Sequence, residues 1–283
     1  MKVEVDLIKV RKRSVDLLYN VVTIFEEQGI KCWLDQGTLL GAIRENDFIP
    51  WDDDIDLGVW KHDINSCPLI WDYFKKSGYY VFHRKKLQAV RIEAKNPEIG
   101  WRSIDINIYH RAGINAIKYF EKRLDNKLSS VFNKLILILD HIHSIKYGPD
   151  LRYKNIRDNI ITNSGSNNSG IVYIDVNDSN DSLFYPILAI IYKNFVPDKL
   201  IRFLKNIIAQ AKLQTCIKII TLKTPISFFE NPSEYNFLGI TASVPDPVND
   251  YLCFKYGSDW LTPKNKNDWV YNRDDGAITI AIK

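Results

Sequence analysis

The sequence has few of the features that mark zinc proteins and nucleic-acid-binding proteins. It contains only four cysteines in 283 residues, and no CxxC pair or other zinc-type spacing joins them. Its five histidines form no HxxxH pair. The net charge is only +4, which is too small to predict a nucleic-acid partner. We therefore expect reduced, mostly buried cysteines and structural histidines.

Long hydrophobic runs are also missing. No stretch reaches the roughly 18 consecutive apolar residues that a membrane span needs. The first 18 residues, MKVEVDLIKVRKRSVDLL, are interrupted by charges and lack the apolar segment of a signal peptide. The sequence therefore predicts a protein that has no transmembrane segment and is not secreted. We expect it in the cytoplasm, or in the host cytoplasm if the source is a virus.

What the sequence does contain is a dense acidic motif within residues 34–59, LDQGTLLGAIRENDFIPWDDDIDLGV. Asp52, Asp53, Asp54 and Asp56 fall within five positions, and carboxylates this close repel one another unless a cation lies between them. Residues 54–59 alternate between acidic or small and apolar side chains, which predicts a strand with Asp54 and Asp56 on one face. A solvated acidic turn or a calcium loop is the alternative, but the ligand spacing of an EF-hand is absent.

A Gly-Thr pair precedes the acidic motif. Gly37 and Thr38 follow a short predicted strand at 30–34 and open a predicted helix over 38–44. Glycine lets the backbone approach a phosphate closely, and a helix amino terminus offers free N–H groups to it. The pair is not a Walker loop, because GxxxxGK[ST] is absent. Arg44 is expected to pair either with a phosphate or with an aspartate of the motif.

A third carboxylate is expected from the strand predicted at 102–109, RSIDINIY, where Asp105 lies on the polar face opposite three isoleucines. Asp54, Asp56 and Asp105 would bracket one or two Mg²⁺ ions, with Mn²⁺ as the alternative. The ions would screen a diphosphate and activate an acceptor hydroxyl, and Asp105 would also accept the proton of that hydroxyl. Arg91 and Arg102 flank this strand and are expected to contact the donor phosphates.

The remaining pattern predicts an α/β or α+β core with a helical second half, and we expect the α+β class. Helices are expected over 7–25, 65–76, 185–194 and 198–211, with a long helix from Ile117 that ends by Gly148. Strands are expected over 79–83, 87–94 and 216–222, and a short C-terminal helix is expected to end at Gly257. Polar stretches at 162–170 and 177–182 predict surface loops, with a flexible lid as the alternative.

Four segments resemble the LicD family, which includes bacterial phosphocholine transferases and is related to fukutin and fukutin-related protein. They are LDQGTLLGAIR, IPWDDDIDLGV, SIDIN and the tail VP…YL…YGSDW…P. The resemblance implies a nucleotidyltransferase-like mixed β-sheet core flanked by helices, with a largely helical second half. It implies that Gly37 and Thr38 hold phosphate and that Asp54, Asp56 and Asp105 bind metal. It divides the chain into a catalytic core at 1–111, a helical region with the polar insert at 112–235, which we expect on the acceptor side, and a closing segment at 236–283.

The resemblance also implies an activity. We expect a magnesium-dependent phosphotransferase of LicD type that moves phosphocholine or ribitol phosphate from a CDP-activated donor to a hydroxyl of a glycan or glycolipid. A nucleotidyltransferase acting on an NTP, a DxD glycosyltransferase using a nucleotide sugar, and a binding-only relative are the alternatives. The third-carboxylate strand departs from the family pattern by continuing through Asn107 and His110. We identify no motif in residues 112–235, so the sequence does not specify the acceptor.

Overall fold

The computed structural model describes most of the chain outside its middle. The described residues are 2–50, 52, 54–95, 102–123, 127–128, 130–132, 134–135, 139, 171–175, 198–264 and 276–277. The chain forms two compact units. The larger unit comprises Val5–Phe120, Arg152–Val172 and Thr221–Lys283, and the smaller comprises Met1–Glu4, Glu121–Leu151 and Tyr173–Ile220. Every site residue predicted above lies in the larger unit.

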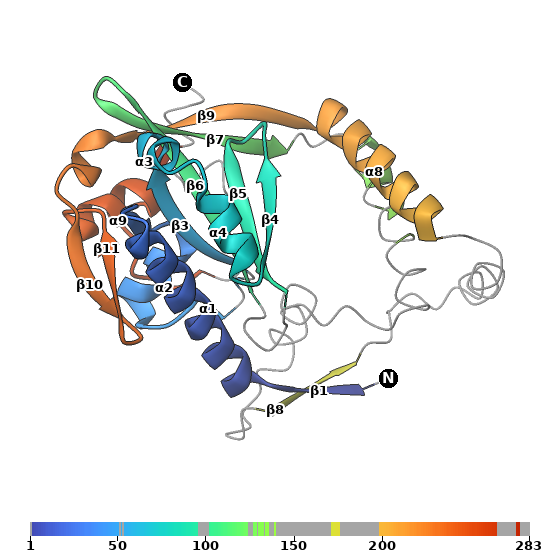
Figure 1. Cartoon of the computed structure of the whole chain (residues 1–283), viewed down its shortest axis with the longest axis horizontal. Helices are drawn as coiled ribbons and strands as arrows, with labels where there is room; N and C mark the ends of the chain where they lie inside the picture. Colours follow the sequence, from blue (N-terminus) through green and yellow to red (C-terminus); the bar gives the residue numbers. More distant parts are fainter. Residues whose placement is uncertain are drawn as a thin grey trace. The chain divides into compact units, whose positions relative to one another are not determined.

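The described chain contains both helices and strands, with consecutive strands from β4 to β7 (Figure 1). Those before residue 130 are β1 (Lys2–Asp6), α1 (Leu7–Glu27), β2 (Cys32–Leu34), α2 (Gln36–Glu45), β3 (Asp54–Trp60), α3 (Lys61–Ser66), α4 (Ile70–Lys76), β4 (Tyr79–Arg84), β5 (Ala89–Ala94), β6 (Ser103–Ala112) and β7 (Asn115–Arg123). Those after it are β8 (Ile171–Asp175), α8 (Asp198–Thr215), β9 (Ile217–Pro225), the 3-10 helix η1 (Ile226–Phe229), β10 (Ser233–Phe237), β11 (Ile240–Val244) and α9 (Val248–Tyr256).

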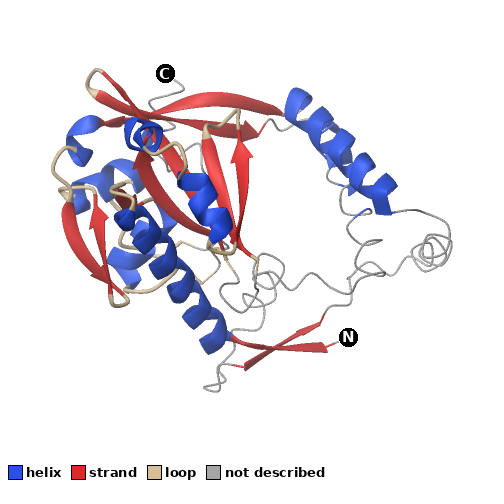
Figure 2. Ribbon diagram, in the orientation of Figure 1, coloured by secondary structure: helices blue, strands red, loops and turns tan. Residues whose placement is uncertain are grey.

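A mixed sheet forms the centre of the larger unit. Among the described residues its strand order is β10-β11-β2-β3-β6-β5-β4, with β7 pairing with β6 and β9, while β1 and β8 form a separate pair. The pairs β11–β2 and β3–β6 are parallel, whereas β2–β3, β5–β6 and β4–β5 are antiparallel. Helices lie against this sheet (Figure 2). The predicted fold class, a mixed sheet flanked by helices, is confirmed.

The helix α1 forms where the sequence predicts it. Asp6 caps its amino terminus, because the Asp6 carboxylate accepts hydrogen bonds from the main-chain N–H groups of Ile8 and Lys9 at 3.0 and 3.1 Å. Its apolar stripe is almost fully buried and packs against α4, with the rings of Phe25 and Phe74 5.1 Å apart. The stripe consists of Leu17, Leu18, Val21, Val22 and Phe25. The two helices lie over one face of the sheet (Figure 1).

Two sequence-based predictions were wrong in detail. The long helix expected from Ile117 does not begin there, because residues 115–123 form β7 and pair antiparallel with β6. Gly113, with φ of +57°, provides the tight turn between these strands, so local pairing overrides the helical spacing of apolar residues. The helix expected over 65–76 is divided at Pro68 into α3 and α4.

Several expectations fall outside the described residues. These are the predicted helix at 185–194, the polar stretches at 162–170 and 177–182, and most of the segment 124–148. Within the described part of the chain, no helix combines the length and apolar character needed to cross a membrane.

Candidate functional site

The parallel pairing of β3 and β6 places the predicted carboxylates side by side. In this register Asp56 is opposite Asp105, and Asp54 is opposite Ser103. Alternate residues of a strand share a face, so the three aspartates lie on one side of the sheet. The other side is apolar and fully buried, with Ile55 and Ile104 both 0% exposed. The core therefore fixes the register of this pair and, with it, the position of the acidic face.

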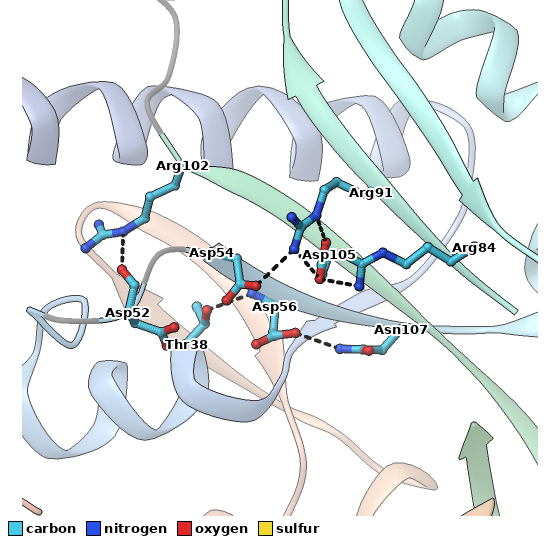
Figure 3. A network of polar contacts seen from close by, with 9 residues as sticks. All are labelled: Thr38, Asp52, Asp54, Asp56, Arg84, Arg91, Arg102, Asp105 and Asn107. Atoms are coloured by element: carbon cyan, nitrogen blue, oxygen red, sulfur yellow. Dashed lines mark hydrogen bonds and ion pairs between the residues drawn. The ribbon is translucent and has the colours of Figure 1, made fainter. Parts of the chain in front are cut away.

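Arg91 on β5 lies between the carboxylates (Figure 3). Its Nε and Nη2 donate to the two oxygens of Asp105 at 2.6 and 2.9 Å, and its Nη2 also donates to Asp54 Oδ2 at 3.3 Å. Arg84 on β4 adds a second cation, with its Nη1 3.1 Å from Asp105 Oδ2. Burial lowers the pKa of Arg91, but the hydrogen bond and charge of Asp105 outweigh it and raise that pKa overall. Asp54 and Asp105 are thus close enough to share one cationic group.

Asp56 lies deeper on the same face. Its Oδ1 accepts a hydrogen bond from Asn107 Nδ2 at 2.9 Å. Burial raises the pKa of Asp56 well above its ordinary value, and the charges of Asp54, Asp105 and Asp35 raise it further, while Lys118 opposes them. A carboxylate with a raised pKa among other carboxylates is stabilised in its charged form when an added cation approaches it.

The donor set suits a hard divalent cation. Three carboxylates and the amide of Asn107 supply oxygen ligands of the kind that Mg²⁺ and Mn²⁺ prefer. Among the described residues, however, no three His, Cys, Asp or Glu side chains are arranged so that they would hold a metal ion without moving. Arg91 is the group that holds Asp54 and Asp105 together in this arrangement. The residues fit a metal provided that this guanidinium shifts.

The turn that begins α2 is built against β3. Asp35 caps the helix by accepting a hydrogen bond from Gln36 N at 2.9 Å. The buried Thr38 hydroxyl accepts a hydrogen bond from Asp56 N at 2.8 Å, so it contacts the acidic strand. A Cβ at Gly37 would overlap the Asp52 carboxylate, so the Asp52 side chain would have to move to admit any larger residue there. The structure therefore brings Gly37 and Thr38 next to the acidic motif, between Asp52 and Asp56.

Two of the predicted phosphate-binding arginines have other partners. The Arg44 guanidinium donates to Glu45 Oε1 at 2.6 Å and to the Trp260 carbonyl at 3.3 Å, and its side chain is 7% exposed. Arg102 is buried, and its Nε donates to the Asp52 carbonyl at 3.0 Å (Figure 3). Arg102 thus contacts the loop before β3, and Arg44 contacts the C-terminal segment. The structure gives both arginines partners within the protein, whereas Arg91 lies on the acidic face.

Four residues near the carboxylates were missed as site residues. Asn107 follows Asp105 by two positions on the polar face of its strand, a spacing that would have identified it. Asp35 precedes a predicted helix, which is the usual position of a capping residue. Arg84 could be recognised only as part of a basic turn. Lys118 was missed because a helix was predicted from Ile117, where the structure forms the strand β7.

The C-terminal segment packs directly against α2. Tyr251 on α9 donates from its hydroxyl to Asp35 Oδ1 at 3.1 Å, and Tyr235 on β10 donates to the Ala42 carbonyl at 3.0 Å. Tyr251 is also part of an aromatic cluster that it forms with Trp33, Trp60, Tyr109 and Phe229. The predicted helix that ends at Gly257 is confirmed as α9. Through the Tyr251 hydroxyl this segment contacts Asp35, which caps α2.

The fold and the site together define a class: an α+β domain whose mixed sheet presents three carboxylates beside a helix amino terminus. A model of the family described as LicD/FKTN/FKRP, nucleotidyltransferase domain, matches residues 29–134. The family predicted from the sequence is confirmed over these residues. The matched residues contain the α2 turn and all three aspartates.

Individual relatives match over shorter stretches. The ribitol 5-phosphate transferase FKRP of Mus musculus is 49% identical over 47 residues, which are 17% of this chain and 10% of that protein. The ribitol-5-phosphate transferase FKTN of Mus musculus is 34% identical over 80 residues, 28% of this chain and 17% of that protein. This chain thus spans less than a fifth of the length of these two relatives. The crystal structure of ANT(2″)-Ia with adenylyl-2″-tobramycin is similar over 36% of this chain and 53% of that chain, with 20% identity and a TM-score of 0.28.

Proposed function

We propose that the chain transfers a phosphorylated alcohol, such as ribitol phosphate or phosphocholine, from a CDP-activated donor to a hydroxyl of a glycan or glycolipid. The observation that carries the proposal is the in-register pairing of β3 with β6, which gathers Asp54, Asp56 and Asp105 on one face. The family model and the two ribitol phosphate transferases support the class of reaction.

In the proposed reaction, the acceptor oxygen attacks the phosphorus that carries the alcohol. A new phosphodiester bond forms, the bond to the CMP oxygen breaks, and the acceptor's proton passes to a carboxylate of the acidic face. Asp54, Asp56 and Asp105 would hold Mg²⁺, or Mn²⁺, which when bound neutralises charge on the diphosphate. The main chain at Gly37 lies at the amino terminus of α2, where N–H groups favour a phosphate.

Arg91 and Arg84 supply positive charge to the same face. In the arrangement seen here, both are ion-paired with Asp105. Once a divalent ion neutralises the carboxylates, the guanidinium groups become available to phosphate oxygens, to which they bind in a bidentate manner. We assign both Arg91 and Arg84 to binding of the donor phosphates.

The test is product analysis with several donors. The purified protein is incubated with Mg²⁺, a glycan or glycolipid acceptor, and CDP-ribitol, CDP-choline, CTP or a UDP-sugar. Release of CMP supports the proposal. Pyrophosphate instead indicates nucleotidyl transfer, and UDP indicates glycosyl transfer, so either product contradicts the proposal.

Two matched variants connect the activity to the site. Asp54→Asn is expected to lower turnover at least about 100-fold while the protein stays folded, because it removes a carboxylate from the reacting centre. Asp72→Asn changes an exposed carboxylate that pairs with Lys75 on α4, and it should keep full turnover. Equal turnover of the two variants would show that the acidic face is not the catalytic site.

A further inference from the structure

The proposed reaction makes no use of Asp35, although it is the most completely buried carboxylate near the site. Asp35 is 0% exposed and lies between β2 and α2. Its Oδ2 accepts from the Tyr109 hydroxyl at 2.8 Å and lies 3.8 Å from Lys118 Nζ. Its Oδ1 accepts from the Tyr251 hydroxyl and from Gln36 N. A buried carboxylate is costly unless it is paired and hydrogen-bonded, and this one is both.

The partners of Asp35 come from elements that are distant in the sequence. Tyr109 belongs to β6, Lys118 to β7 and Tyr251 to α9. Lys118 is itself only 6% exposed, and it also lies over the Tyr109 ring at 5.6 Å. The carboxylate is therefore the common point at which the site strand, its neighbour and the C-terminal helix meet.

The main chain around Asp35 holds Asp56 from both sides. Asp35 N donates to the Asp56 carbonyl at 3.0 Å, and Asp56 N donates to Thr38 Oγ1 at 2.8 Å. The turn from 35 to 38 thus fixes both main-chain groups of Asp56. Any rotation of this turn would move the peptide units from which the Asp56 carboxylate projects.

This turn is conformationally strained. Gln36 has φ of +47°, in the left-handed region that residues with a side chain rarely adopt. Such a conformation costs about 1–3 kcal/mol and persists where the surroundings hold it in place. The hydrogen bond from Gln36 N to the Asp35 carboxylate is the contact that holds it, and Tyr109, Tyr251 and Lys118 hold the carboxylate in turn.

We propose that Asp35 is a positioning residue: its buried carboxylate fixes the turn from 35 to 38 and thereby places Asp56 for ligand binding, and it couples this placement to α9 through Tyr251. The proposal rests on the proposed function, in which Asp56 helps to hold a divalent ion. Asp35 does not touch the ligand. Like the hydrogen-bond partners that orient the ligands of a metal, it acts indirectly, by orienting a side chain that binds the ion.

The experiment measures the affinity for Mn²⁺ by titration calorimetry and compares four proteins. Asp35→Asn keeps the size of the side chain but removes its charge, and it is expected to weaken Mn²⁺ binding about 10–100-fold. Tyr251→Phe removes one donor to Asp35 and should weaken binding less. Tyr235→Phe removes an equivalent hydroxyl contact to α2, at Ala42, and should bind as the wild type does. A merely structural role would lower the unfolding temperature of Asp35→Asn and leave its Mn²⁺ affinity unchanged.

A double variant distinguishes a loss of Mn²⁺ affinity from a loss of folding. Asp35→Asn leaves the Lys118 cation buried without its carboxylate, so we also measure Asp35→Asn with Lys118→Met, which removes that cation. A folded single or double variant with wild-type Mn²⁺ affinity overturns the positioning role. If both fail to fold, Tyr109→Phe decides, because it removes one donor and keeps the charge, and unchanged affinity then overturns the role. A wild-type protein that binds no Mn²⁺ overturns the proposed function and the positioning role together, whereas binding by the wild type leaves the two distinguishable.

Discussion

Arg91 gives the sharpest prediction about how the acidic face is neutralised. It bonds both oxygens of Asp105 and reaches Asp54, and the side chains of Arg91 and Asp105 are only 24% and 14% exposed. Removing one partner of a buried ion pair costs about 3–5 kcal/mol. Because this pair is partly exposed, we expect Arg91→Met to lower the free energy of unfolding by about 2–3 kcal/mol without divalent ions. For a protein of 283 residues, that is a fall in Tm of about 3–5 °C.

Mg²⁺ should reverse this loss. In the wild type the ion must displace Arg91 from the carboxylates, whereas in Arg91→Met it meets unneutralised charge and should bind more tightly. A ligand at 100 times its Kd stabilises the folded state by about 2.7 kcal/mol, which is close to the deficit. The expected result is therefore a large Tm gap in EDTA that nearly closes when Mg²⁺ is added.

The assay is thermal unfolding in EDTA and across a Mg²⁺ titration. Arg11→Met is the matched control, because Arg11 on α1 pairs with Asp47 at 2.6 Å but is 50% exposed. Exposed pairs contribute about 0–1 kcal/mol, so this variant should follow the wild type. If Mg²⁺ raised the Tm of wild type and Arg91→Met equally, Arg91 would not occupy the place of the cation, and the reasoning would be refuted.

Two further predictions concern stability. Asp56 has a raised pKa, so above its ordinary value of 3.8 the folded state binds more protons than the unfolded state, and stability falls as pH rises towards the folded-state pKa. Asp56→Asn should remove this fall and be more stable than wild type at pH 7 in EDTA; a less stable variant in urea unfolding would contradict the assignment. Gly58→Ala would drive a Cβ into the Trp33 indole, which Tyr109 and Phe229 hold at ring distances of 5.3 and 5.1 Å, so we expect a loss of about 1–3 kcal/mol. Wild-type stability of this variant in the same assay would show that the aromatic cluster can rearrange to admit the added Cβ.

The strands of the site could be predicted because their pattern is local. Asp54 to Val59 alternates between the two faces, and the segment around Asp105 alternates in the same way, so each strand could be recognised from its own residues. Their parallel pairing could not be derived from spacing, because it joins residues about 50 positions apart. The sheet establishes the register, through the isoleucine and leucine side chains buried beneath the carboxylates.

The strand β7 shows why the helix prediction failed. Its apolar residues are compatible with helical spacing, but the structure buries Ala116 and Lys118 on one side of the strand. A buried lysine has no signal in a hydrophobic pattern, because its burial depends on Asp35 and on the Tyr109 ring. The sequence-based prediction therefore placed Lys118 within a helix and missed its place beside the site.

The hairpin of β10 and β11 was missed for a different reason. Its two turn residues are Leu238 and Gly239, with φ of +54° and +86°. Two-residue hairpins need positive φ at both positions, which Asn-Gly or Asp-Gly usually supply. Leucine gives no such signal, and here the Asn236 side chain supports the turn by accepting a hydrogen bond from Gly239 N at 3.2 Å. The sequence could not reveal that this segment belongs to the sheet.

That hairpin changes how the site is assembled. β11 pairs in parallel with β2 at Ser243 and Trp33, so the C-terminal segment continues the sheet directly beyond the strand that leads into Asp35. Tyr251 then returns from α9 to the same carboxylate. The acidic strands at 54–60 and 103–112 thus depend on residues 233–256 for the edge of β2 and for one donor to the buried charge. Within the described part of the larger unit, residues 32–38 and residues 233–256 therefore meet at the turn of the site.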